Sequence, residues 1–379
     1  MNITRLQFEG FRNLKDSFIE PCDGVNIIYG NNAQGKTNLL ECIWLFTGGH
    51  SFRGARHREL VSFERENARI KMDFYSQQRD QKAVIDIAAG KREVTINGVK
   101  KNSPSEIIGR FCAIVFSPEH LTFVKSGPGE RRRFMDGAIC QIKPRYAAVL
   151  ARYNQTLSQR NALLKEIRFR PELKDTLSIW NERLAYFGAH ICAERLDYIK
   201  KLRKYAARFH DGISRGTEEF DVSYSSTWGG SEESTINEIR EKLNDVFEAN
   251  FKTDFHGGFT GNGPHRDDID ILINGKRAKI YGSQGQQRSA VLSLKLAEAE
   301  ILKNSISEKP VILLDDVLSE LDPYRQDFLI NEIKGWQVFI TCCEPYAIDG
   351  LITGKSFNLI EGSVNSDLTH GNGEPLGPT

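Results

Sequence analysis

A glycine-rich run near the N-terminus has the residue types and spacing of a phosphate-binding loop. The run GNNAQGKT, from Gly30 to Thr37, fits the pattern G-x-x-x-x-G-K-T. Glycines let backbone N–H groups turn inward around phosphate oxygens, and the positive end of a following helix adds to the attraction. The preceding run VNIIY predicts a buried strand, and apolar residues recur at helical spacing after Thr37. The loop therefore has the context that phosphate binding requires.

The residues of this loop have separate expected roles in binding a nucleoside triphosphate. Lys36 is predicted to bridge the β- and γ-phosphates through charge-assisted hydrogen bonds, and Thr37 is predicted to ligate Mg²⁺. The other predicted nucleotide-binding residues are Gly30, Asn31, Asn32, Ala33, Gln34 and Gly35. We therefore expect ATP and Mg²⁺ as cofactors.

The acidic partner of this loop comes near the other end of the chain. The run VILLDD places Asp315 after four apolar residues, which predicts the carboxyl end of a buried strand facing the phosphate loop. Asp315 is expected to hold Mg²⁺ through water, and Asp316 to orient or deprotonate the attacking water. Adjacent carboxylates repel each other unless a cation lies nearby, which favours a metal. Lys36, Asp315 and Asp316 are thus the predicted catalytic residues.

A second glycine-containing run precedes a predicted helix shortly before the acidic strand. The run YGSQGQQR, from Tyr281 to Arg288, is similar to the L-S-G-G-Q signature loop of ATP-binding-cassette ATPases, with Gln284 replacing a glycine. In that class the loop faces the γ-phosphate of ATP held by the other subunit. The resemblance implies a homodimer in which nucleotide is bound in trans by Ser283, Gln284, Gly285 and Gln286.

The segment after the acidic pair supports two compatible interpretations. Residues Ser319 to Pro323 resemble the segment of cassette ATPases that touches the facing subunit. The same residues also predict a helix start, with Asp322 as N-cap and Pro323 at the first helical position.

The elements that position these motifs predict an α/β fold: an ABC/SMC-type P-loop ATPase head, discontinuous in sequence, with an inserted, mainly helical arm domain. Residues 1–120 are expected to hold the phosphate loop and a β-rich lobe, with a hairpin turn at Asn97-Gly98. Helical periodicity predicts the arm over 121–255. The C-terminal part of the head is expected over 256–361, and residues 362–379, rich in Gly, Asn and Pro, as a flexible tail.

Composition limits the class of protein. A net charge of +1 over 379 residues means that any DNA contact must come from local basic patches. There is no run of eighteen apolar residues and no apolar secretory segment at the N-terminus, so we expect no membrane association. Seven cysteines without a C-x-x-C pair favour reduced thiols in a cytoplasmic protein.

Three local basic groups are candidates for DNA contact through the backbone, with little sequence preference. The favoured group holds Arg53, Arg56 and Arg58, together with His57. The second group flanks the first Asn-Gly turn and holds Lys91, Arg92, Lys100 and Lys101. The third is the triplet Arg131, Arg132 and Arg133, which could equally brace helices.

Several longer segments resemble the RecF family of bacterial DNA replication and repair proteins, which are SMC-like, cassette-type ATPases. They include LQFEGFRNL, GNNAQGKTNLLE, SFRGARHREL, FSPEHLTFVKSGPGERRRFMD, GPHRDD and LLDDVLSELD, and together they cover nearly the whole chain. The resemblance implies an ATP-dependent dimer that binds single- and double-stranded DNA or their junctions, with slow, DNA-stimulated hydrolysis. It also implies action with RecR and RecO in loading recombinase at gaps and stalled forks, and a nucleoid-associated location in the cytoplasm.

The chain departs from the wider ATPase class at the strand after the acidic pair. A switch histidine commonly follows that strand, which here ends QVFITCCE with Thr341 in its neighbourhood. Asp316 is also one methylene shorter than the glutamate usual at the base position. We therefore expect slow turnover, suited to a timer or a switch.

Three other functions stay open on these observations. A small-molecule P-loop kinase would need a substrate pocket and a lid, and would form a phosphorylated product. A structural chromosome protein of the SMC type would need hundreds of residues of heptads. The motor subunit of a transporter would need a membrane partner and a closer L-S-G-G-Q match.

Overall fold

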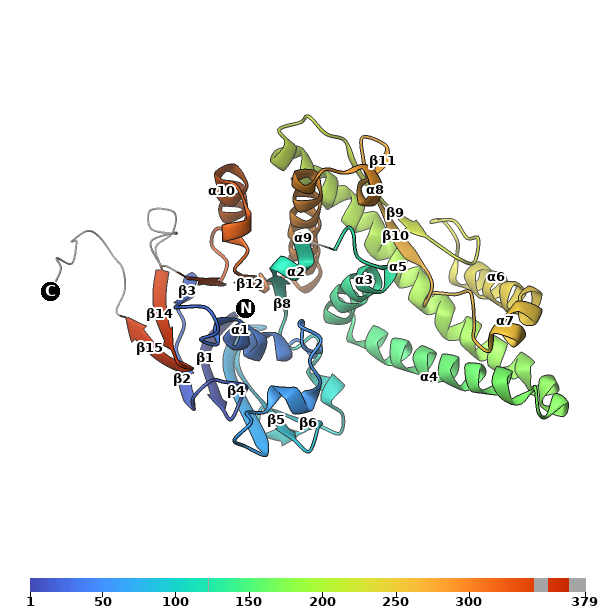
Figure 1. Cartoon of the computed structure of the whole chain (residues 1–379), viewed down its shortest axis with the longest axis horizontal. Helices are drawn as coiled ribbons and strands as arrows, with labels where there is room; N and C mark the ends of the chain where they lie inside the picture. The colour runs from blue at the N-terminus through green and yellow to red at the C-terminus, as the bar shows by residue number, and fades with distance from the viewer. Residues whose placement is uncertain (122, 344–353, 368–379) are drawn as a thin grey trace. The chain divides into compact units, whose positions relative to one another are not determined.

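The computed structural model describes residues 1–121, 123–343 and 354–367, and the chain forms two compact units (Figure 1). The head unit comprises Met1–Leu121 and Glu298–Thr379, and the arm unit comprises Thr122–Ala297. The head is therefore built from both ends of the chain around a long insertion, as the sequence predicts. Among the described helices, none is both long and apolar enough to cross a membrane.

A six-stranded sheet carries the nucleotide motifs of the head unit. Its order is β15 (Ser363–Asp367), β14 (Gly354–Ile360), β3 (Val25–Tyr29), β13 (Val338–Cys342), β12 (Val311–Asp315) and β8 (Ala113–Phe116). Only β15 is antiparallel to its neighbour. All residues of β8 and β12 are buried, as expected for parallel strands covered on both faces. Helix α1 (Lys36–Leu45) contacts β8, β12 and β13, and its N-terminus carries the phosphate loop.

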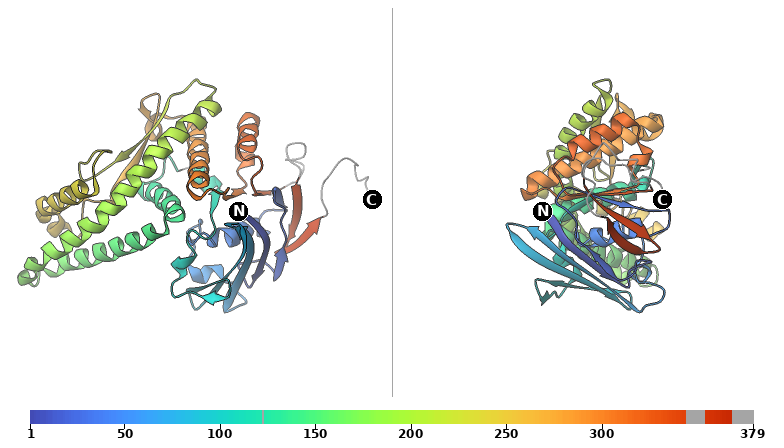
Figure 2. Two further views of the ribbon diagram at one scale, coloured as in Figure 1. Left: turned by 180° about the vertical axis from the view of Figure 1, so that it is seen from behind. Right: turned by 90° about the vertical axis from the view of Figure 1, so that its left-hand side faces the viewer.

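A second sheet of the head unit is antiparallel and forms the predicted β-rich lobe (Figure 2). Its order is β2 (Ser17–Ile19), β1 (Asn2–Glu9), β4 (Asn67–Ser76), β5 (Arg79–Ala88), β6 (Lys91–Ile96) and β7 (Val99–Lys100). Burial alternates along β4, so one face of the sheet packs on the core. The turn between β6 and β7 has positive φ at both Asn97 (49°) and Gly98 (80°), which confirms the predicted hairpin.

Short helical elements complete the head unit. They are the 3₁₀ turns His57–Leu60, Pro104–Ile107 and Leu318–Glu320, and the helices α2 (Pro118–Leu121) and α10 (Pro323–Glu332). The Asp322 side chain accepts a hydrogen bond from the Arg325 backbone N–H, and Pro323 occupies the first turn of α10. The predicted helix start is thus confirmed.

Long helices and a small sheet make up the arm unit. The helices are α3 (Pro128–Ile142), α4 (Pro144–Glu166), α5 (Leu177–Ser214), α6 (Ile236–Ala249), α7 (Phe251–Gly257) and α8 (Ala278–Tyr281), with a 3₁₀ turn at Pro171–Thr176. Helices α4 and α6 both pack against the 38-residue α5 (Figure 1). Strands β9 (Phe220–Ser225), β10 (Asp268–Ile273) and β11 (Lys276–Arg277) form an antiparallel sheet. Helix α9 (Gln284–Ile306) contains the boundary between the two units.

Two predicted boundaries differ from the structure. Residues 256–297 belong to the arm unit, whereas we expected them in the head. The physical reason is that β10 pairs with β9, a strand that the sequence analysis did not predict, and Asp268 pairs with Arg131 of α3. The predicted tail at 362–379 is also partly structured, because residues 363–367 form β15 against β14. The rest of that tail lies outside the described residues.

Candidate nucleotide-binding site

The backbone of the phosphate loop needs glycine at two positions. Gly30 has φ of 147°, and a Cβ atom there would lie 2.3 Å from the Leu359 carbonyl oxygen. Gly35, the N-cap of α1, has φ of 108°, and its Cβ would lie 2.8 Å from Asn13 Oδ1. Both positions combine left-handed backbone with close neighbours, so a side chain would displace the loop.

Neighbouring segments brace the loop from outside the motif. The Asn13 amide donates to the Ala33 carbonyl oxygen at 3.1 Å, and Asn38 donates to Asn13 Oδ1 at 2.7 Å. The Gln34 side chain accepts a hydrogen bond from the Glu361 N–H, in the turn between β14 and β15. The sequence analysis did not find Asn13 and Glu361 because they lie far from the loop in the chain, whereas Asn38 directly follows Thr37.

Lys36 lies inside the loop, as predicted. Its side chain is buried, and Nζ donates to the carbonyl oxygens of Gly30 at 2.7 Å and Asn31 at 3.1 Å. A cavity of about 240 Å³ adjoins this ammonium group. The cavity is lined by Asn32, Ala33, Gly35, Lys36, Thr37, Asn38, Arg53 and Asp316. A cation, a helix N-terminus and several amides therefore face one space, which suits an anion.

The acidic strand meets the loop directly. Thr37 Oγ1 donates to Asp315 Oδ1 at 2.8 Å, although the two residues are 278 positions apart. Thr341, at the matching register position on β13, donates to the same oxygen at 3.0 Å. The Thr341 hydroxyl also accepts the Asp316 backbone N–H at 2.8 Å. The sequence located Thr341 near the site but did not reveal that it links both acids.

Asp316 has an unusual backbone conformation for its type. Its φ is 50°, in the left-handed region that non-glycine residues rarely adopt. The hydrogen bond from its N–H to Thr341 holds this conformation, and its carbonyl oxygen accepts from Ser319 Oγ at 2.8 Å. The residue lines the same cavity as Lys36.

The environment of Asp315 suits a hard cation. Burial raises the pKa of its carboxyl, and the charge of Asp316 raises it further, against the hydroxyl bonds from Thr37 and Thr341. A nearby cation would offset the cost of burying this negative charge. The donors are a hydroxyl and carboxylates, which are the oxygen ligands that Mg²⁺ prefers. The side chains of Thr37 and Asp315 therefore fit the predicted metal site.

The favoured basic group is divided between two places. Arg53 is exposed and lines the phosphate cavity, where its guanidinium donates to Asn38 Oδ1 at 3.1 Å. Arg56 and Arg58 are also exposed, at and after the start of the 3₁₀ turn His57–Leu60. Arg53 is thus placed to meet a nucleotide, whereas Arg56 and Arg58 stay candidates for DNA contact.

Three of the other basic candidates have structural roles instead. Arg92 is buried and donates to the carbonyl oxygens of Gly48 and Gly49, just after α1. Arg131 is buried and forms a bidentate pair with Asp268, and Arg132 donates to the Asp267 carbonyl oxygen. The sequence does not reveal the partner of Arg92, whereas bracing of helices was already an alternative for the arginine triplet.

The signature loop opens α9. Ser283 and Gln284 are exposed, and the Ser283 hydroxyl accepts the Gln286 N–H at 3.2 Å. The Gln286 side chain accepts the Ser283 N–H at 2.8 Å, which completes a capping box. The Ser283 hydroxyl therefore lies exposed at the N-terminus of a 23-residue helix, the end of a helix that attracts anions.

A hydrogen-bonded pair behind the loop, His210 and Glu218, was not found from the sequence. The Gln286 amide donates to Glu218 Oε1 at 2.8 Å, and Glu218 Oε2 lies 2.9 Å from His210 Nε2. His210 is fully buried, stacks on Phe220, and contacts the Ser293 hydroxyl of α9 at 3.3 Å. Because its side-chain oxygen bonds Ser283 and its side-chain nitrogen bonds Glu218, Gln286 braces the loop and is not directed toward a second protomer.

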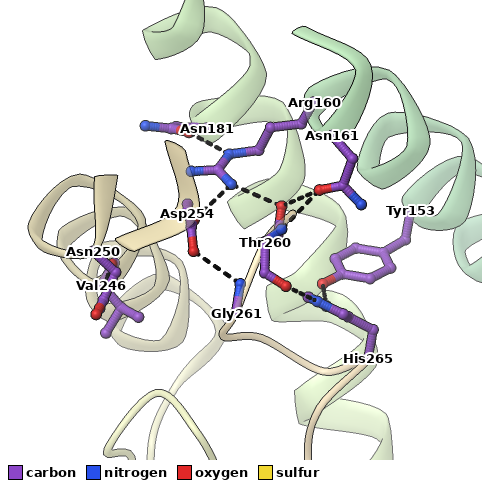
Figure 3. A network of polar contacts seen from close by, with 10 residues as sticks. All are labelled: Tyr153, Arg160, Asn161, Asn181, Val246, Asn250, Asp254, Thr260, Gly261 and His265. Atoms are coloured by element: carbon purple, nitrogen blue, oxygen red, sulfur yellow. Dashed lines mark hydrogen bonds and ion pairs between the residues drawn. The ribbon is translucent and has the colours of Figure 1, made fainter. Parts of the chain in front are cut away.

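The segment GPHRDD ties the arm unit together (Figure 3). His265 Nδ1 accepts from the Tyr153 hydroxyl at 2.7 Å, and Nε2 donates to the Thr260 carbonyl oxygen at 2.9 Å. Burial, with nearby arginines, lowers the pKa of His265 to about 4. Thr260 is in turn bonded to Asn161 and to Arg160, whose guanidinium pairs with Asp254 at 2.8 Å. This network fixes the fold of the arm unit.

Comparison with known proteins decides the family. A model of the RecF/RecN/SMC N-terminal domain matches residues 2–351. The RecF protein of Acetivibrio thermocellus is 41% identical over 349 residues, which cover 91% of this chain and 94% of that protein. The chain belongs to the RecF family. A second RecF, from Caldanaerobacter subterraneus subsp. tengcongensis, is also 41% identical, over 92% of this chain and 96% of its own length.

Solved structures agree with this membership in the RecF family. A recombination mediator protein RecF with ATP, in the RecFOR pathway, aligns with a TM-score of 0.90 at 39% identity, covering 97% of this chain and 98% of that one. An SMC head domain bound to the winged-helix domain of ScpA aligns with a TM-score of 0.57 at 15% identity, covering 98% of each chain. The predicted SMC-like ATPase fold is thus confirmed.

Proposed function

We propose that this RecF-family chain is an ATP-driven recombination mediator that binds DNA and closes as a dimer. The observation that carries the proposal is the bond between Thr37 and Asp315, which joins the phosphate loop to the acidic strand beside one anion-suited cavity. A RecF relative of the same length and fold was solved with ATP in the RecFOR pathway, which supports ATP as ligand and a role in that pathway.

The residues that line the cavity have separate roles in ATP hydrolysis. Lys36 and the loop N–H groups hold the β- and γ-phosphates, and Arg53 contributes a second positive charge from the side. Thr37 and Asp315 would hold Mg²⁺, and the bound ion would supply positive charge next to the phosphates. Asp316 orients the attacking water. Its short side chain and the absence of a histidine at Thr341 support slow turnover, with DNA as the stimulus.

A second copy of the chain completes the site. The exposed Ser283 hydroxyl and the N-terminus of α9 suit the γ-phosphate of ATP bound to another protomer. ATP then favours the dimer because only the dimer supplies both halves of the site. Hydrolysis removes the γ-phosphate contacts and releases the partner.

Membership in the RecF family supports the cellular role that we propose. The dimer binds single- and double-stranded DNA or their junctions at gaps and stalled forks, and acts with RecR and RecO to load recombinase. The chain would therefore work at the nucleoid. Kinase and transporter functions lose support, because the curated relatives that match nearly the full length are DNA replication and repair proteins.

Sedimentation with and without ATP and DNA tests this proposal. The unmodified chain is expected to shift from monomer to dimer with ATP, and Lys36→Met is expected to lose nucleotide binding. Ser283→Arg is expected to bind ATP yet stay monomeric, because the new side chain blocks the exposed loop, and Ser283→Ala serves as the small control. Unimpaired dimerisation of Ser283→Arg would overturn the cross-subunit role.

A further inference from the structure

A row of cations lies along the C-terminal half of α5, outside every basic group that the sequence analysis selected. Lys200, Lys204 and Arg208 are all exposed, and we call them the α5 stripe. Across the described part of the chain, no ion pair joins any of the three to an acid. The segment from Lys200 to Arg208 contains no acidic residue at all.

The spacing of the stripe places the three charges on one side of the helix. Residues four apart on an α-helix are neighbours on the same face, separated by about 6 Å along the axis. The stripe therefore extends about 12 Å, a length over which each strand of duplex DNA carries about three to four phosphates. The Arg208 guanidinium also lies 4.5 Å from the centroid of the Phe209 ring.

Other cations in the same part of α5 differ from the stripe because they are paired with acidic residues. Lys201 pairs with Asp197 at 2.9 Å, and Arg203 pairs with Asp221 at 3.1 Å and with Glu232. The same segment of α5 therefore contains cations that are paired with acids and, among the described residues, three that are not. An unneutralised row of this kind raises the local positive potential and attracts a polyanion.

The stripe lies on α5, the helix whose His210 contacts residues that brace the signature loop. His210, two residues after Arg208, contacts Ser293 of α9 and Glu218, which accepts the Gln286 amide. All of these residues belong to the arm unit and are packed as one body. A molecule bound to this part of α5 could therefore shift the contacts of α9, the helix that begins at the signature loop.

We propose that the α5 stripe is a contact surface for the phosphate backbone of DNA, and that DNA bound there stimulates ATP hydrolysis through α5 and the signature loop. The proposal rests on the proposed ATP-driven, DNA-binding function and assigns its DNA contact to a face of the arm. Recognition is of backbone charge, so the surface should not distinguish one base sequence from another.

A salt titration of DNA affinity tests the proposal. The full chain is compared with the triple variant Lys200→Gln, Lys204→Gln and Arg208→Gln, using a short duplex of mixed sequence and ATP. The variant is expected to lower the slope of log affinity against log salt by about 2.7 for each protomer in contact, since each lost phosphate contact contributes about 0.9. DNA stimulation of ATP turnover should be lost, while the rate without DNA stays unchanged.

A matched variant controls for total charge. Arg183→Gln, Lys242→Gln and Lys252→Gln remove three exposed cations from other parts of the arm unit, and the slope should then fall by much less. An unchanged slope in the stripe variant would overturn the proposal, and the stripe would then be a candidate surface for an acidic protein instead of DNA. If the unmodified chain binds no DNA while still dimerising with ATP, the proposed DNA-binding function itself fails, which is a distinct outcome.

Discussion

Replacing Thr341 by valine removes the hydroxyl that links the Asp315 carboxylate to the backbone N–H of Asp316. In the unmodified chain that hydroxyl donates to Asp315 Oδ1 at 3.0 Å and accepts the Asp316 N–H at 2.8 Å. Valine keeps the β-branched shape that suits a buried strand, so β13 should still form. The variant therefore separates the hydroxyl from the packing around it.

The size of the effect follows from the two bonds. A hydrogen bond to a charged carboxylate contributes about 1.5–3 kcal/mol, and an unpaired buried N–H costs about 1–3 kcal/mol. The Asp316 N–H also holds a backbone with φ of 50°, which should relax once the bond is gone. We expect Asp316 to leave its place beside the cavity, and kcat to fall by about tenfold to a hundredfold, which corresponds to about 1.4–2.7 kcal/mol of barrier.

Steady-state ATP hydrolysis measures this effect. The KM for ATP should stay nearly unchanged, because Lys36 and the loop backbone are not altered, and Thr341→Ser should recover most of kcat. A general packing defect would lower activity in the serine variant as much as in the valine variant. If Thr341→Val keeps the unmodified kcat, or if serine fails to rescue it, Thr341 does not position the acids.

Three further predictions concern stability. Burial lowers the pKa of His265 from 6.5 to about 4, so the unfolded chain binds more protons between these pH values and stability is lost as pH falls through that range. Between pH 7 and pH 4, the free energy of unfolding from denaturant titrations should fall by about 3 kcal/mol more for the unmodified chain than for His265→Gln. An equal fall in both proteins would contradict the buried neutral state. Burial raises the pKa of Asp315, so its ionised form destabilises the fold near neutral pH. Without Mg²⁺ and ATP, Asp315→Asn should therefore melt at a higher temperature than the unmodified chain, and this difference in melting temperature should shrink as pH falls. A lower melting temperature for the variant would count against this account. Arg92→Ala should lower the free energy of unfolding by about 1–3 kcal/mol and leave the salt dependence of DNA binding unchanged, whereas a reduced salt slope would restore Arg92 as a DNA contact.

The phosphate loop and the acidic strand could be predicted because each is a local pattern with a fixed mechanism. The run from Gly30 to Thr37 dictates its own backbone, and four apolar residues before Asp315 dictate a buried parallel strand. Their direct contact across 278 positions was expected only because two such patterns imply one site.

Non-local partners were beyond the reach of the sequence. Strand β9 was not predicted, and its hydrogen-bonding partner β10 lies more than forty residues further along the chain. Glu218 and His210 likewise gain their roles only through Gln286 and Ser293. Thr341 is an intermediate case, because parallel pairing of two equal strands would have placed it opposite Asp315.

Mixing two inactive variants tests most directly whether one ATP is shared by two copies of the chain. Lys36→Met disables the phosphate loop, and Ser283→Arg blocks the signature loop, so each variant alone should hydrolyse almost no ATP. In a mixed dimer, the intact loop of one protomer meets the intact signature of the other, and ATP hydrolysis should return to a fraction of the unmodified rate. A mixture as inactive as its separate components would contradict the shared site.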